Sequence, residues 1–208
     1  MKNTLIYVHD PMCSWCWGFD PVRRELFEAV SPTMQIKRLL GGLAPDSDQP
    51  MPESMQQMLQ QTWARIHELT GAPFNFDFWR DCSPRRSTYP SNRAVIAARE
   101  QGEEYDAAMT ARIQQAYYQE ARNPSDDETL IDLAADIGLD ADRFAETLGS
   151  GATDSALQQE IMQARAIGVE GFPSLVVERD GYLCHVRVNY TNLDSMLRDI
   201  EAANASLA

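Results

Sequence analysis

The 208-residue sequence contains no hydrophobic run that approaches the roughly 18 residues of a membrane-spanning helix. Its first four residues lead straight into a short apolar segment, without the hydrophobic region and small-residue cleavage site of a secretory leader. Low-complexity tracts that would indicate a disordered tail are absent as well. We therefore expect a globular, cytoplasmic protein without a membrane partner.

Basic residues are also in deficit, because 18 Lys and Arg stand against 31 Asp and Glu, for a net charge of −13. Such an acidic chain repels the phosphates of nucleic acids and of anionic lipids, so neither is an expected partner. Hydrophobic residues make up 44% of the sequence. This length and composition predict one well-buried core, or one domain with a large insertion.

Cysteines are few, but two of the four lie three residues apart, as Cys13 and Cys16. A zinc site would need a second ligand pair, and none has the spacing, because adjacent Cys184 and His185 would point to opposite faces of a strand. A structural disulfide would close a very small loop and constrain the unfolded chain little. In a compartment that keeps thiols reduced, the pair indicates redox chemistry, and no metal is expected.

The two cysteines lie where a predicted strand gives way to a predicted helix. Residues 4–8 form an apolar, β-branched and aromatic run typical of a buried strand, and residues 19–30 carry a helical apolar stripe. Cys13 then lies at the helix N-terminus, where N–H groups and the helix dipole favour a thiolate. Cys16 lies one turn further, at roughly 5 to 6 Å between Cβ atoms, so a disulfide can open and close with little backbone movement.

The remaining pattern predicts a strand at 34–40, a helical block from 53 to about 166, a hairpin of two strands around Asp180-Gly181 and a last helix at 192–203. A capping box, Ser125 to Glu128, is expected to open one helix of the block. The aromatic stretch at 74–79 is interpreted as core packing. The order predicts an α/β sheet with helices on both faces and an inserted helical subdomain.

Two motifs in this order resemble the thioredoxin superfamily: Cys13-Ser14-Trp15-Cys16 after the first strand and Gly171-Phe172-Pro173 before the third. The element order resembles the DsbA-like branch, and the stretches at 10–16 and 168–173 are similar to its cytosolic FrnE-type members. The resemblance implies a thioredoxin-like domain of residues 1–50 and 168–208. Residues 51–167 would form the inserted helical subdomain.

The resemblance also implies roles for single residues. Cys13 matches the nucleophile and Cys16 the resolving thiol, and Pro173 matches a loop proline whose preceding peptide bond is cis. The main chain of Phe172 would then pair with an extended substrate. An ordinary trans proline at the start of an edge strand is the alternative for Pro173.

Two features depart from the family pattern. Ser14-Trp15 supplies no cation inside the motif, so the redox poise is left open; both residues are still expected at the substrate-binding surface, with Trp15 as a hydrophobic rim. Tyr7 stands six residues before the nucleophile, where many relatives carry a buried acid for proton transfer. Water or His9 is the alternative proton acceptor.

The other two cysteines are assigned smaller roles. Cys82 lies in a predicted loop beside Arg85 and Arg86, so it is a candidate for a third reactive thiol. Cys184 is expected to be a small buried side chain within a strand. Trp17 is expected to belong to the core.

These observations predict a thiol–disulfide oxidoreductase or isomerase that acts on protein or peptide substrates containing disulfides or thiols. No tightly bound cofactor is expected, and glutathione is a candidate redox partner. A glutathione-dependent isomerase or transferase, resembling kappa-class transferases and hydroxychromene-carboxylate isomerases, is one alternative, although those proteins typically have Ser at the nucleophile position. A non-enzymatic adaptor is the other, although it would need neither cysteine. The sequence predicts no oligomeric state.

Overall fold

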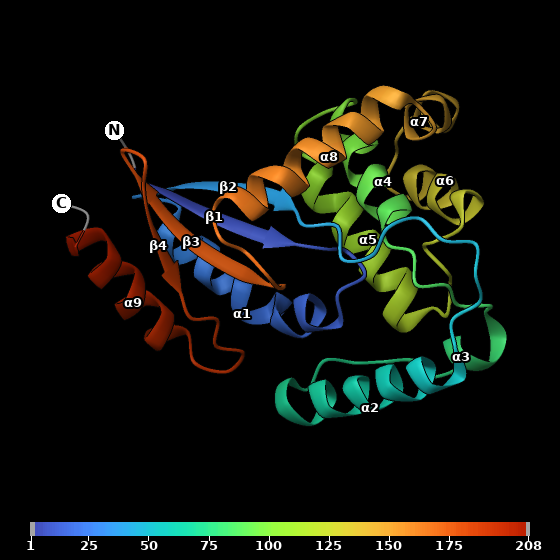
Figure 1. Cartoon of the computed structure of the whole chain (residues 1–208), viewed down its shortest axis with the longest axis horizontal. Helices are drawn as coiled ribbons and strands as arrows, with labels where there is room; N and C mark the ends of the chain where they lie inside the picture. Colours follow the sequence, from blue (N-terminus) through green and yellow to red (C-terminus); the bar gives the residue numbers. More distant parts are fainter. Residues whose placement is uncertain (1–2, 207–208) are drawn as a thin grey trace.

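The computed structural model describes residues 3–206, whose strands form one sheet in the order β2-β1-β3-β4 (Figure 1). β1 is parallel to β2 and antiparallel to β3, and β3 is antiparallel to β4. The strands are β1 (Thr4–His9), β2 (Gln35–Leu40), β3 (Ser174–Arg179) and β4 (Tyr182–Val186). This arrangement, with helices on both faces of the sheet, confirms the predicted thioredoxin-like α/β fold.

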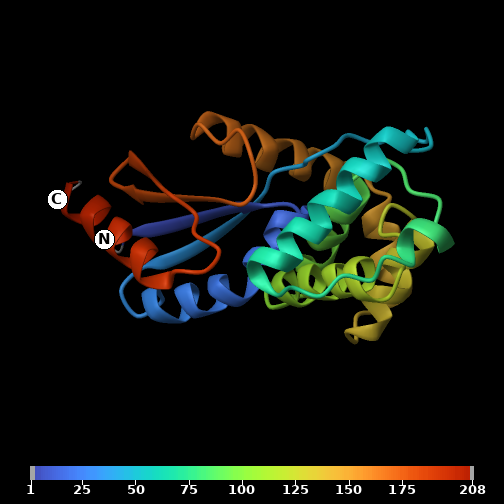
Figure 2. The same cartoon turned by 90° about the horizontal axis from the view of Figure 1, so that it is seen from below.

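Helix α1 (Ser14–Val30) connects β1 to β2, and α9 (Leu193–Ser206) follows β4. Figure 2 shows both on one side of the sheet and α8 on the other. The helices between β2 and β3 are α2 (Glu53–Thr70), α3 (Phe78–Asp81), α4 (Tyr89–Arg99), α5 (Tyr105–Gln119), α6 (Asp127–Asp136), α7 (Ala141–Leu148) and α8 (Gly151–Ala166). None of the helices in the described part of the chain is long and apolar enough to cross a membrane.

β1 is buried on both of its faces, which explains its unbroken apolar sequence. Leu5 and Tyr7 pack with α1 and α9, whereas Ile6 and Val8 pack with residues at the end of α8 and just after it. All four are at most 5% exposed. Because successive side chains of a strand point to opposite faces, Tyr7 and His9 both point toward the α1 side, behind the cysteines.

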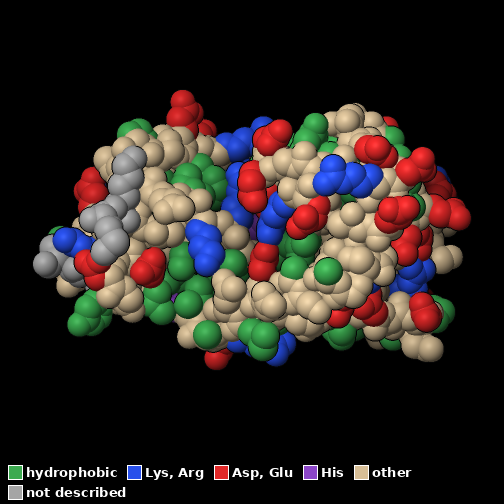
Figure 3. Space-filling model, turned by 90° about the horizontal axis from the view of Figure 1, so that it is seen from above, with side chains coloured by type: hydrophobic (Ala, Val, Ile, Leu, Met, Phe, Trp, Pro, Cys, Tyr) green, Lys and Arg blue, Asp and Glu red, His purple; other side chains and the backbone are tan. Residues whose placement is uncertain are grey.

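Ion pairs join the sheet to the helical block. Asp106 of α5 pairs with Arg38 of β2 and with Arg99 of α4, and Arg99 also pairs with Glu160 of α8. Glu160 in turn accepts a hydrogen bond from the backbone N–H of Leu40, at 2.7 Å. Figure 3 shows basic and acidic side chains side by side across the middle of the face seen from above. The helical block is thus fixed against the β2 edge.

α1 begins at Ser14, directly after Cys13, so the predicted position of Cys13 at the helix N-terminus is confirmed and Cys16 lies within the first turn. Helix α8 begins earlier than the sequence pattern predicts. The apolar stripe predicts a start at Ser155, whereas α8 begins at Gly151, because the hydroxyl of Ser150 accepts a hydrogen bond from the Thr153 N–H at 3.1 Å. The first turn of α8 lacks the apolar periodicity by which this helix was predicted.

The predicted capping box of α6 is wrong. α6 begins after Asp126, and no side chain caps it. The hydroxyl of Ser125 donates instead to the Ser87 carbonyl at 2.7 Å, inside the protein. The Ser125 hydroxyl is therefore engaged in a tertiary hydrogen bond and does not cap the helix.

The aromatic stretch at 74–79 packs as predicted, around the buried Trp63 of α2. This cluster includes Tyr118, whose hydroxyl donates to the Met12 carbonyl at 2.7 Å, one residue before Cys13. Trp17 is half-buried rather than fully buried; it stacks on Tyr118 with ring centroids 5.6 Å apart. The aromatic cluster thus supports the segment that carries the cysteines.

Candidate active site

The end of β1 turns into α1 through residues 10–13, and this turn presents Cys13. The backbone N–H of Cys13 donates to the Asp10 carbonyl at 3.0 Å, and Cys13 is the N-cap of α1. Its Sγ donates a hydrogen bond to the Phe172 carbonyl at 3.4 Å, and the Phe172–Pro173 peptide bond is cis. The structure therefore confirms the predicted cis bond and brings together two motifs that lie 159 residues apart.

Cys13 and Cys16 are both free thiols in this structure, and they differ in their surroundings. Cys16 is 1% exposed, and burial raises the pKa of its thiol well above the usual range. The hydrogen bond and the charge of Cys13 raise this pKa further. Cys16 therefore keeps its proton at neutral pH, whereas Cys13, at 6% exposure, borders an open pocket.

A buried carboxylate, that of Asp10, holds the turn in place. Its Oδ1 accepts from the Met12 N–H at 2.8 Å; its Oδ2 accepts from the Leu43 N–H, the Thr88 hydroxyl and the Asn92 amide at 2.7 to 2.8 Å. Burial raises the pKa of Asp10, and these four hydrogen bonds oppose that shift. Residues from the loop after β2 and from α4 thus fix the turn before Cys13.

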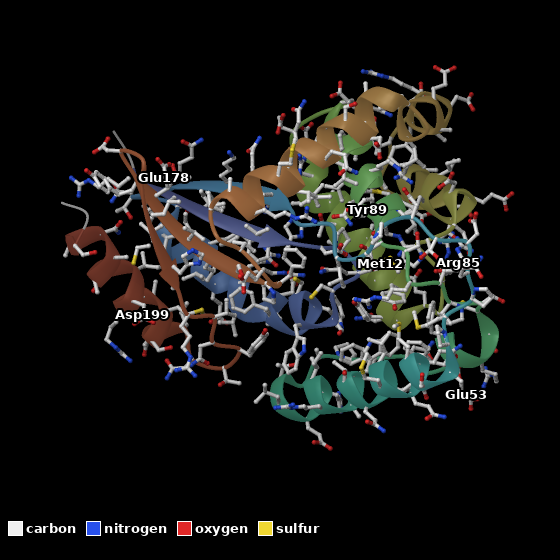
Figure 4. The ribbon with its side chains drawn as sticks, viewed as in Figure 1. Met12, Glu53, Arg85, Tyr89, Glu178 and Asp199 are labelled. Atoms are coloured by element: carbon white, nitrogen blue, oxygen red, sulfur yellow. The ribbon has the colours of Figure 1, made fainter. Side chains whose placement is uncertain are left out.

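The pocket beside Cys13 has a volume of about 260 Å³. Predicted site residues Ser14, Trp15 and Phe172 line it together with Cys13. Opposite them lie apolar residues of α2 and the segment with Arg85 and Arg86. In Figure 4, Met12 and Arg85, which both line this pocket, lie above α2 in the view. The inserted helices therefore form one wall of the site.

Gly41 sets the position of the loop with Phe172. A Cβ built on Gly41 would lie 1.9 Å from the Phe172 ring, a distance that no side chain can tolerate. The N–H of Gly41 donates to the His9 carbonyl at 2.7 Å, so its backbone cannot easily retreat. The Phe172 ring therefore occupies the space that a side chain at position 41 would need.

Trp15 is half-buried and packs on Tyr190, with ring centroids 5.0 Å apart. The guanidinium of Arg65 lies over the Trp15 ring, 6.0 Å from its centroid. Ser14 is buried, so it contributes little surface to the pocket.

Tyr7 lies behind Cys16. Burial raises the pKa of the Tyr7 hydroxyl well above its usual range, and the charge of Cys16 adds to the shift. His9 stacks on Tyr7 at 4.8 Å, and burial lowers the pKa of His9 to about 3. Within residues 3–206 neither ring nitrogen of His9 has a hydrogen-bond partner. A neutral imidazole with so low a pKa is a poor proton acceptor for Cys16, which argues against His9 in that role.

Cys82 does not lie in an environment that favours a thiolate. Its thiol donates to the Ala121 carbonyl at 3.0 Å. Burial raises its pKa, and Asp126 and Asp81 raise it further, although two arginines follow it in the sequence. Cys184 is half-buried against the core. Among residues 3–206, no three His, Cys, Asp or Glu side chains are grouped to hold a metal ion.

A dithiol at a helix N-terminus, in contact with a cis-proline loop on this sheet, places the chain in the class of thioredoxin-like proteins. The chain belongs to the family of the DsbA-like thioredoxin domain, whose model matches residues 4–198. Family and site together support thiol–disulfide oxidoreductase chemistry in general.

Two similar solved structures cover the whole fold. A candidate protein disulfide isomerase from Nitrosomonas europaea is 26% identical, with a TM-score of 0.87 and 100% of both chains covered. The cytosolic disulfide reductase DsbM from Pseudomonas aeruginosa is 29% identical, with a TM-score of 0.79 and coverage of 99% of this chain and 100% of that one. A further DsbM structure contains GSH; it is 28% identical, with a TM-score of 0.74 and 98% of each chain covered.

Curated relatives include the ClpXP adapter protein SpxH. The SpxH of Halalkalibacterium halodurans is 24% identical over 175 residues, which are 82% of this chain and 57% of that protein. The SpxH of Bacillus subtilis is 23% identical over 80% of this chain and 55% of that protein. The chain thus spans a little more than half the length of these relatives.

Replacing Asp10 by Asn is expected to destabilise the protein by about 2 to 4 kcal/mol, because an amide nitrogen would face buried donors that now bond to a carboxylate. Urea unfolding measures this change. Asp48→Asn, at an exposed position, is the matched control and should leave stability within about 0.5 kcal/mol of the wild type. Equal stability of the two variants would contradict the role given to Asp10.

Gly41→Ala is expected to slow reaction with a disulfide substrate about tenfold to a hundredfold, because the added methyl group would push the Phe172 ring and its carbonyl away from Cys13. Rates with a model disulfide peptide measure the effect. Gly151→Ala, where a Cβ meets open space, is the control. Wild-type rates in Gly41→Ala would show that the Phe172 position does not matter.

In a Cys82→Ser, Cys184→Ser background, iodoacetamide at pH 7 is expected to alkylate Cys13 much faster than Cys16. The reason is that a raised pKa leaves little Cys16 thiolate at this pH, and its fraction grows only as pH rises above the usual thiol range. Peptide mass mapping after timed quenching distinguishes the two sites. Faster labelling of Cys16 would overturn the assignment.

Proposed function

We propose that this protein is a thiol–disulfide oxidoreductase that reduces disulfides in peptides or proteins, with Cys13 as nucleophile and Cys16 as resolving thiol. The observation that carries the proposal is the Cys13 thiol in contact with the Phe172 carbonyl, at the edge of an open pocket. The same carbonyl and N–H groups near Pro173 are suited to pair with an extended substrate backbone.

The reaction runs in two balanced steps. The Cys13 thiolate attacks one sulfur of the substrate disulfide, which forms a mixed disulfide and releases the other substrate sulfur as a thiolate. Cys16 then loses its proton to water and attacks the Cys13 sulfur. The second substrate thiolate leaves, and the Cys13–Cys16 disulfide forms, so the substrate has gained the two electrons that the protein has lost.

A thiol reductant must then restore the dithiol, and we assign this role to glutathione, without a tightly bound cofactor. Two glutathione thiols reduce the Cys13–Cys16 disulfide and leave as glutathione disulfide. The similar protein DsbM is a disulfide reductase, and one of its structures contains GSH, which supports electron transfer from glutathione to the substrate. The cytosolic location of DsbM also supports the cytoplasm as the location. Disulfide isomerisation would use the same mixed disulfide without the second step.

The test measures the reduction of insulin by glutathione. Glutathione reductase regenerates the glutathione, and the consumption of NADPH reports the rate. The wild type is expected to accelerate the reaction, Cys13→Ser to abolish the acceleration, and Cys16→Ser to accumulate a mixed disulfide with substrate. Cys82→Ser and Cys184→Ser are the matched controls and should stay within about twofold of the wild type. A Cys13→Ser variant as active as the wild type would refute the proposal.

An adaptor function is the second candidate, because the curated relatives are ClpXP adapter proteins. An adaptor would bind one partner protein and would need neither thiol. Stoichiometric binding of a partner that persists unchanged in a Cys13→Ala, Cys16→Ala double variant, without disulfide reductase activity in the wild type, would favour this function. A glutathione transferase is disfavoured, because Cys13 occupies the nucleophile position.

A further inference from the structure

Most arginines of this acidic protein form an ion pair with a carboxylate. Within residues 3–206, Arg23, Arg85, Arg93 and Arg112 are examples of arginines that pair with Asp or Glu. A smaller group is exposed, with neither an ion pair nor a side-chain hydrogen bond in the described part of the chain. Its members are Arg65, Arg86, Arg165, Arg187 and Arg198.

Three of these unpaired arginines lie in or beside two depressions, one of which contains the proposed nucleophile, Cys13. Arg86 lines the pocket that contains Cys13. Arg65 lies at the ring of Trp15, which lines the same pocket. Arg187 lines a second depression of about 550 Å³, between the end of α2 and the segment that leads into α9. Three of the five unpaired arginines therefore lie at these two depressions.

The two depressions adjoin through a pair of aromatic rings. Trp15 lines the pocket at Cys13 and Tyr190 lines the depression at Arg187, and their ring centroids are 5.0 Å apart. A chain that lies in the first depression can continue over these rings into the second. We call this continuous area the arginine-rimmed surface; it comprises the two depressions and Arg65.

Both depressions of the arginine-rimmed surface include exposed apolar side chains. Leu43 and Met58, which are 37% and 51% exposed, line the pocket at Cys13, and Leu69, 48% exposed, lines the depression at Arg187. Exposed large apolar side chains beside unpaired cations mark a surface made for contact. Methionine also adapts its shape to different side chains, which suits a surface that binds more than one sequence.

We propose that the arginine-rimmed surface binds an extended polypeptide with acidic and apolar residues next to its disulfide. This inference rests on the proposed function and names its substrate class. Carboxylates of the substrate would supply the charges that Arg65, Arg86 and Arg187 lack within the protein. A polypeptide rather than a small disulfide is required, because Arg86 and Arg187 line two separate depressions and Arg65 lies at the Trp15 ring, beside the first. Asp199 also lines the depression at Arg187 and reduces the positive potential there.

The test compares two synthetic disulfide peptides that share their apolar residues and differ only in Glu against Gln at the flanking positions. The wild type, reduced in advance, is expected to react about tenfold faster with the Glu peptide at low ionic strength, and the difference should shrink as salt is added. The triple variant Arg65→Gln, Arg86→Gln, Arg187→Gln is expected to lose this preference, with about a twofold loss for each arginine.

The double variant Arg165→Gln, Arg198→Gln is the matched control, since it removes two other exposed, unpaired arginines that line neither depression. It should keep the wild-type preference. Glutathione disulfide serves as the small substrate. The rate of its reaction should fall far less in the triple variant than the rate of the reaction with the Glu peptide. Thermal unfolding checks that all variants fold alike.

The outcomes separate this inference from the function on which it rests. No reaction of the wild type with either peptide would refute the oxidoreductase itself. Reaction with both peptides at one rate, or an equal loss in the triple and the control variants, would refute only the arginine-rimmed surface. An equal loss of rate for glutathione disulfide and for the Glu peptide would show that the arginines bind a small disulfide instead of a polypeptide.

Discussion

The buried carboxylate of Asp10 is the group on which the geometry of the site depends. A buried charge is tolerated only when hydrogen bonds replace the lost water. For Asp10 these bonds come from the nucleophile turn, the loop after β2 and the start of α4. The carboxylate is therefore stable only while all three segments are in place. This makes the helical block part of the active site, because its displacement would leave the charge without donors.

The different characters of the two thiols also follow from position in the fold. The motif contains no cation, so the contrast between Cys13 and Cys16 does not come from a charged neighbour inside it. Cys16 lies in the first turn of α1 with its thiol toward Tyr7 and the core, where burial penalises the thiolate. Cys13, at the N-cap, borders the pocket instead. The start of α1 at Ser14, directly after Cys13, produces this division.

Local sequence patterns predicted the features that depend on neighbouring residues, such as the Asp180-Gly181 hairpin, the amphipathic helices and the position of Cys13 at a helix start. The cis bond before Pro173 and its approach to Cys13 came from the family resemblance. The donors to Asp10 and the contact of Phe172 with Gly41 were missed, because each joins residues that are distant in sequence and has no local signal. The failed capping box of Ser125 has the same cause, since tertiary packing redirected its hydroxyl.

Net charge constrains the electrostatic potential far from the protein, but it does not determine the potential near the site. A charge of −13 disfavours polyanions as a whole, but in physiological salt a charge is felt only over about 8 to 10 Å. The potential at the pocket is therefore set by the side chains around it. Most arginines elsewhere pair with Asp or Glu, whereas Arg65 at Trp15 and Arg86 in the pocket have no carboxylate partner in the described part of the chain. An acidic protein can thus present a positive surface to a partner, and composition alone does not reveal it.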